Sequence, residues 1–157
     1  MRGSFASQVR AFERKTARKM DLAVRKIALK IFAQIVLKSP VDSGRFRSNW
    51  QVSIGSVPSG TQEGNEFPQG DAVDVKGPIY YAKLSGGEAA LFGANAGDTI
   101  YFANNLPYAR RLEEGGYMAG PKVVNGHSSQ APNGMVALTI QEFQSIVSAI
   151  GIELSIQ

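Results

Sequence analysis

The sequence contains no cysteine, and it contains a single histidine among its 157 residues. Without cysteine the fold cannot be held by disulfides, and no thiolate metal site can form. The one histidine, His127, has no second imidazole or thiolate with which to share a metal ion. We therefore expect neither a disulfide scaffold nor a bound metal, and no cofactor.

Apolar runs long enough to span a membrane are also missing, and the basic start lacks the apolar segment of a signal peptide. We therefore expect a protein without membrane or secretory segments. With 43% hydrophobic and 19% charged residues, the composition is that of a globular protein. A chain of this length is expected to form one domain, residues 1–157, around one core.

The sequence signatures of common enzyme classes are absent. It has no GxSxG elbow and no phosphate-binding glycine motif of the GxGxxG or GxxxxGK[ST] type. His127 lies among serines in a glycine-flanked loop, where such neighbours are expected by chance. A loose group of acidic residues fits no EF-hand spacing, and solvated loop charge is the favoured interpretation: Glu63, Glu66, Asp71 and Asp74. We expect no catalytic residue, with a hydrolase acting through His127 as the third hypothesis.

Charge is divided unevenly along the chain. Residues 1–38 contain ten lysines and arginines against two acidic residues, a net charge of +8, which leaves −4 for the remainder of a chain whose net charge is +4. Such an asymmetry favours a basic segment that meets nucleic acid or lipid, or a positive face that docks on the negative face of a neighbouring copy. Both interpretations stay open at this point.

The basic segment has the periodicity of a long amphipathic helix, which we place over residues 7–37. Apolar residues recur along one side at helical steps: Val9, Phe12, Met20, Val24, Ile27, Ile31 and Ile35. A helix of this length spans about 45 Å, more than one small domain needs, so the turns before Met20 are expected to project beyond the core. Four arginines on this helix are expected to face a neighbouring copy or DNA, with a solvated face weighed equally: Arg10, Arg14, Arg18 and Arg25.

The densest cluster of structural signals is DTIYFANNLPYARRLEEGG, residues 98–116. Alternation predicts a strand over residues 99–103, the asparagines and proline predict a turn, and a short helix follows over residues 108–114. A rigid turn followed by paired charges suits a contact with another subunit, for which we nominate Tyr108, Arg110, Arg111, Glu113 and Glu114. A solvated helix with internal ion pairs is weighed equally.

Other elements follow from the same rules. A strand is expected at residues 49–54, with Trp50 as a core anchor, and Arg45 and Arg47 in the preceding turn are expected to be exposed. Long loops are expected at residues 55–70 and 117–132.

Four further elements complete the prediction. The dipeptide NG at residues 125–126 predicts a small hairpin within the second loop. A short strand is expected at residues 72–76 and a weak helix at residues 78–92, interrupted near its glycines. The last helix is expected from residue 133 or 134 to residue 150, with Gly151 ending it and a tail beyond.

Three stretches, in the same order, resemble a family of tailed-bacteriophage neck and tail-completion proteins, often labelled minor tail components or head-tail joining proteins. They are SPVDSGRFRSNWQVSIG (39–55), GDTIYFANNLPYARRLEEG (97–115) and QAPNGMVALTIQEF (130–143). Together they cover about a third of the chain. Residues 1–38 carry no motif of the family, residues 56–96 depart from its pattern, and the insertion before the third stretch is longer than expected.

The resemblance implies an α+β fold with a small antiparallel sheet packed by a long N-terminal helix and a C-terminal helix. It implies a non-enzymatic virion protein that forms a homo-oligomeric ring around the DNA channel, at the neck or tail end. Its partners would be the capsid connector or adaptor and the tail terminator or tail tube, with passive contact to packaged DNA. It would reside in the virion and in the host cytoplasm during assembly. The alternative is a nucleic-acid-associated protein that uses the basic helix.

Overall fold

A computed structural model describes residues 4–63 and 86–156, and its first and longest element is helix α1 (Phe5–Lys38). The helix begins after Ser4, whose hydroxyl accepts a hydrogen bond from the Ser7 amide at 3.4 Å. It ends before Ser39 and Pro40, because a residue that precedes proline disfavours helical backbone. The helix predicted over residues 7–37 is therefore confirmed, with slightly wider bounds.

A two-stranded antiparallel sheet packs against one side of α1. Strands β1 (Trp50–Ile54) and β2 (Ile100–Asn104) pair with Val52 opposite Phe102. The ring of Phe102 stacks on that of Phe32 of α1, with centroids 6.1 Å apart. Trp50 is buried as predicted, and its Nε1 donates to the Ser39 hydroxyl at 2.7 Å.

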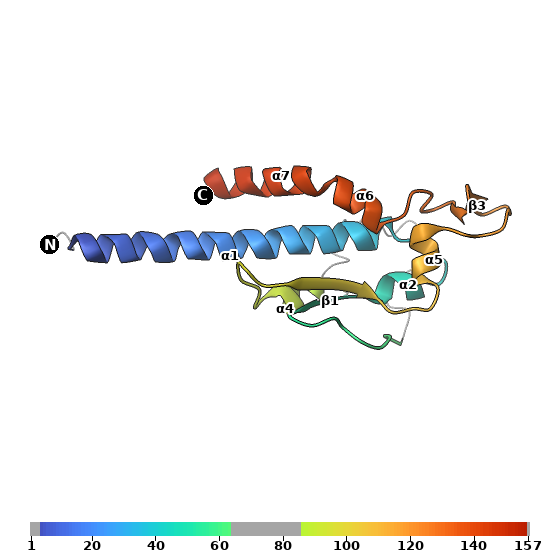
Figure 1. Cartoon of the computed structure of the whole chain (residues 1–157), viewed down its shortest axis with the longest axis horizontal. Helices are drawn as coiled ribbons and strands as arrows, with labels where there is room; N and C mark the ends of the chain where they lie inside the picture. Colours follow the sequence, from blue (N-terminus) through green and yellow to red (C-terminus); the bar gives the residue numbers. More distant parts are fainter. Residues whose placement is uncertain (1–3, 64–85, 157) are drawn as a thin grey trace.

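The C-terminal region forms two helices, α6 (Val136–Gln141) and α7 (Phe143–Ile156), rather than one. The prediction that Gly151 ends the last helix is wrong, since α7 runs through it. Glycine inside a helix costs about 1 kcal/mol, and burial of Leu154 in the next turn, in a cluster packed against α1, offsets that cost. Figure 1 shows α7 lying alongside α1.

The turn before the sheet contains a short helix, α2 (Arg45–Ser48), that the sequence did not indicate. Arg45 is exposed as predicted, but the predicted exposure of Arg47 is wrong, because only 7% of that residue is accessible. Its guanidinium donates to the carbonyls of Ser39 and Leu37 at 2.8 and 2.9 Å. The last carbonyls of α1 have no helical partners of their own, and Arg47 supplies donors for them.

The remaining elements are short: α4 (Gly87–Leu91), α5 (Ala109–Glu114), β3 (Val123–Val124) and β4 (His127–Ser128). Strands β3 and β4 pair across the predicted NG turn, where Asn125 and Gly126 both have positive φ.

The fold is α+β, with a small antiparallel sheet and long helices at both ends of the chain. The strand predicted at residues 72–76 and most of the helix predicted at residues 78–92 lie outside the described residues. Residues 55–63 form neither helix nor strand, as expected for the first loop.

Candidate assembly surfaces

The N-terminal half of α1 stands apart from the core. Every residue from 4 to 20 is exposed, whereas all the buried residues of the helix lie between Ala28 and Val36. Figure 1 shows this half extending well beyond α7 and the sheet. The expected projection of the first helical turns is confirmed.

The projecting half carries an uncovered apolar face, which we call the N-terminal stripe and define as Phe5, Val9, Phe12 and Met20. Their exposed fractions are 81%, 46%, 73% and 54%. Thr16 completes the row and donates its hydroxyl to the Phe12 carbonyl at 2.9 Å, so its polar group is satisfied within the helix. Side chains of this size are seldom left in water along a whole helical face. The stripe therefore has the character of a contact surface.

The stripe continues the line on α1 that α7 covers further along. Steps of three and four residues lead from Phe5 to Ala23 and Ile27, which pack against the buried cluster Ile146, Ile150 and Leu154 of α7. One face of α1 is thus covered by a helix in its C-terminal half and bare in its N-terminal half.

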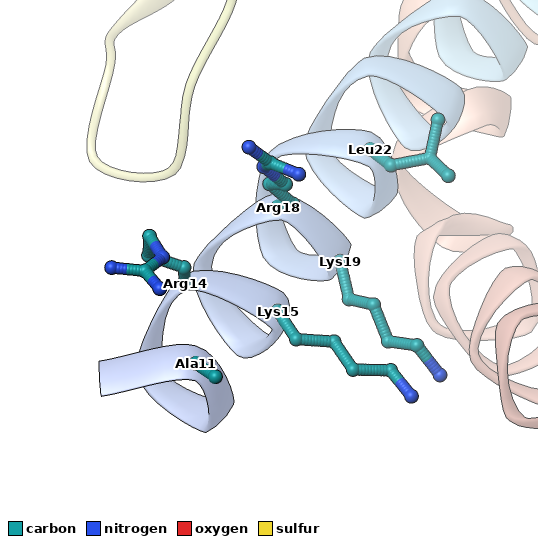
Figure 2. Close-up of a pocket in the computed structure, with 6 residues that line it drawn as sticks. All are labelled: Ala11, Arg14, Lys15, Arg18, Lys19 and Leu22. Atoms are coloured by element: carbon teal, nitrogen blue, oxygen red, sulfur yellow. The ribbon is translucent and has the colours of Figure 1, made fainter. Parts of the chain in front are cut away.

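Basic side chains surround the bare half. Arg10, Arg14 and Arg18 recur every four residues on the side opposite the stripe. Figure 2 shows Lys15 and Lys19 reaching out together on one side of the helix, with Arg14 and Arg18 on another. Residues 4–22 contain five basic and two acidic side chains, a net charge of +3.

Arg25 differs from the other three nominated arginines. Its Nε donates to the Ala94 carbonyl at 2.6 Å, and its guanidinium lies 5.8 Å from the centroid of the Phe92 ring. It thereby holds the segment after α4 against α1. Arg10, Arg14 and Arg18, in contrast, lie on the projecting half.

The nominated residues of α5 separate into inward and outward groups. Arg110 and Glu114 form an exposed ion pair at 2.7 Å, and the hydrogen bond and charge of Glu114 raise the pKa of Arg110. Arg111 donates to the Gly116 carbonyl at 2.8 Å and covers the Tyr117 ring at 4.8 Å.

Glu113 points toward α6 and caps it. Its carboxylate accepts hydrogen bonds from the amides of Met135, Val136 and Ala137 at 2.8, 3.0 and 2.8 Å. These amides lie at the start of the helix and have no carbonyl partners within it, so a carboxylate is a suitable acceptor for them. Tyr108 is 39% exposed and packs against Phe46, with ring centroids 6.0 Å apart. Sequence reasoning did not reveal this cap, because it joins residues more than twenty positions apart.

A second feature is a surface cavity of about 360 Å³, which we call the apolar groove. Ile31 and Ile35 of α1, Trp50 and Phe102 of the sheet, and residues of α6 and α7 line it: Val136, Thr139, Ile140 and Phe143. Ile140 and Phe143 are exposed by 68% and 42%. No local pattern marks this groove, since four separate stretches of the chain form it.

Among the described residues, the contacts of His127 are with its own hairpin and with Gly115. Its Nδ1 lies 3.2 Å from the Asn125 carbonyl of its own hairpin, and its ring packs against Gly115. Across residues 4–63 and 86–156, no group of three or more histidines, cysteines and acidic residues is placed to hold a metal ion. In that same part of the chain, no helix is long and apolar enough to cross a membrane.

Comparison of the chain with known protein families, with curated proteins and with solved structures finds no match.

Proposed function

We propose that this chain is a structural subunit that works by assembling with copies of itself, in a ring at the neck or tail end of a tailed bacteriophage. The observation that carries the proposal is the projecting half of α1, where Phe5 and Phe12 are largely exposed beside a row of arginines. A protein that stays monomeric leaves these apolar side chains in water, whereas a protein that assembles buries them in a contact.

The place in a virion rests on the three sequence stretches that resemble neck and tail-completion proteins. The first contains Arg47 and Trp50, which tie the end of α1 to the sheet. The second supplies β2 and α5, and the third begins with Gln130, whose side chain bonds both backbone groups of Val41. All three stretches therefore lie in the body of the fold.

In the proposed ring, capsid connector or adaptor proteins lie on one side and tail terminator or tail tube proteins on the other. The chain catalyses no reaction and needs no cofactor. Particles assembled without this protein are expected to accumulate as DNA-filled heads that lack joined tails, which electron microscopy distinguishes from complete particles. Normal numbers of tailed, infective particles in its absence would refute the proposal.

The exposed pair on α5 gives a separate test of where subunits meet. Reversing the charge of Arg110 to Glu removes its pairing with Glu114 but touches no buried group. If α5 lies at a subunit boundary, the Arg110→Glu variant is expected to assemble poorly, and the double change with Glu114→Arg to recover in part. If the Arg110→Glu variant assembles like the wild type, α5 does not lie at a subunit boundary. Arg111→Glu is a weaker probe, because Arg111 also supports the backbone at Gly116.

A second candidate function is binding of nucleic acid, and one observation favours it. Arg10, Arg14 and Arg18 form an exposed row on a projecting helix, which suits contact with phosphates. Each phosphate contact contributes a slope of about −0.9 to the dependence of log K on log salt. The chain would then bind duplex DNA at moderate salt, and replacement of the three arginines by Gln would flatten the salt dependence. A binding constant that is unaffected by this replacement would exclude the role.

A further inference from the structure

The N-terminal stripe lacks a cover that the rest of the same helical face possesses. In the C-terminal half of α1, the cluster around Ile150 and Leu154 of α7 buries the face at Ala23 and Ile27. From Phe5 to Met20 the face continues for sixteen residues, about 24 Å of helix, and its side chains are exposed. The continuity of the face indicates that an apolar surface belongs on this half too.

Net charge indicates which surface of a second copy can contact the projecting half. Residues 4–22 carry a net charge of +3, whereas the rest of the described chain, residues 23–63 and 86–156, carries nine basic and eight acidic side chains, a net charge of +1. Two projecting halves placed together would bring like charges close, which is unfavourable. A projecting half placed on the body of another copy meets a nearly neutral surface, so this arrangement avoids most of that repulsion.

The body of the chain offers one groove that is almost wholly apolar. Its lining includes the exposed Ile140 and Phe143 and the buried Trp50. Its volume of about 360 Å³ accommodates aromatic side chains. Burial of a phenylalanine removes on the order of 150 to 250 Å² from water, so Phe5 and Phe12 together supply a large part of the roughly 800 Å² per partner of a stable interface.

We propose that the N-terminal stripe of one copy docks in the apolar groove of the next copy, with Phe12 as its central anchor. This inference rests on the proposed function and names the contact through which the copies assemble. Stripe and groove are different surfaces of one chain, so each copy uses both. A contact of this head-to-tail kind extends from copy to copy and closes into a ring when the rotation allows.

The test uses two exposed positions whose replacement leaves the folded core untouched. Phe12→Asp places a carboxylate on the stripe, and Ile140→Asp places one on the rim of the groove, where the wild-type residues are 73% and 68% exposed. Met118→Asp is the matched control, because Met118 is 87% exposed and belongs to neither surface. Sedimentation velocity of the full chain over a range of concentrations measures self-association. Circular dichroism checks that each variant remains folded.

Phe12→Asp and Ile140→Asp are each expected to weaken self-association by about 30-fold or more, as loss of an interface hot spot does, while Met118→Asp behaves as wild type. The two defective variants mixed in equal amounts are expected to form a dimer that grows no further. In that dimer the intact stripe of the Ile140→Asp chain occupies the intact groove of the Phe12→Asp chain.

Three results would overturn the proposed contact. Wild-type association of Phe12→Asp excludes the stripe, and wild-type association of Ile140→Asp together with loss in Phe12→Asp indicates that stripes pair with each other. A mixture that remains monomeric excludes a head-to-tail contact. If both variants form the wild-type oligomer, self-assembly stands and only this contact is wrong. If the wild-type chain is monomeric at every concentration, the proposed contact is wrong, whereas the proposed function fails only if tailed particles assemble normally without the protein.

Discussion

Replacement of Glu113 tests how the body of the fold is held together. In the structure its carboxylate accepts three amide hydrogen bonds at the start of α6, from residues 135, 136 and 137. Glu113→Ala leaves these amides without a protein partner. Loss of a capping side chain costs about 0.5 to 2 kcal/mol, and hydrogen bonds to a charged group contribute about 1.5 to 3 kcal/mol. Solvent reaches this helix end, so we expect a loss of about 2 kcal/mol overall.

Urea unfolding of the Glu113→Ala variant, followed by circular dichroism, measures this loss. For a chain of this length it corresponds to a decrease in Tm of about 4 to 8 °C. Glu114→Ala is the control, since the exposed pair of Glu114 with Arg110 contributes about 0 to 1 kcal/mol. If the two variants are equally stable, the cap contributes nothing beyond a surface charge and the reasoning is refuted.

Three further substitutions test other contacts that hold the body of the fold together. Arg47→Ala removes the donors to the last carbonyls of α1 and is expected to cost about 3 kcal/mol in urea unfolding; a loss below 1 kcal/mol would contradict the capping role. Trp50→Phe breaks the bond to Ser39 and leaves a buried hydroxyl with one partner fewer, so a loss of about 1 to 2 kcal/mol is expected. Gly134→Ala is expected to lower Tm, because φ is +77° there and an added Cβ would lie 2.7 Å from the carboxylate of Glu113; an unchanged Tm would show that the cap can move aside.

Local patterns predicted much of the fold. The long basic helix, both strands of the main sheet and the hairpin at Asn125 and Gly126 follow from periodicity and turn chemistry, which act over a few residues. The projection of the first helical turns was also predictable, because a helix of that length exceeds the width of a small core.

Long-range packing accounts for the parts that the sequence did not reveal. Gly151 is a common helix terminator, yet burial of Leu154 against α1 carries α7 past it. Arg47 has the composition of a surface residue, but the end of α1 requires its donors.

The candidate surfaces, too, were predictable only where they depend on local sequence patterns. Periodicity identified Val9, Phe12 and Met20 as apolar positions of the helix, and the structure shows all three exposed on its projecting half. Ile140 was missed, since the groove arises only where α1, the sheet and α6 converge. Glu113 was nominated for a subunit boundary, and the structure shows a role that the sequence did not reveal, since its carboxylate caps α6.

The mass of the assembled protein tests the central claim most directly. We propose that copies of this 16.9 kDa chain work by fitting against one another. Native mass spectrometry of the full chain at increasing concentration is predicted to show one closed oligomer, at an integral multiple of the chain mass, that disappears in the Phe12→Asp variant. A single copy at every concentration, in solution and in tailed particles, would contradict the account.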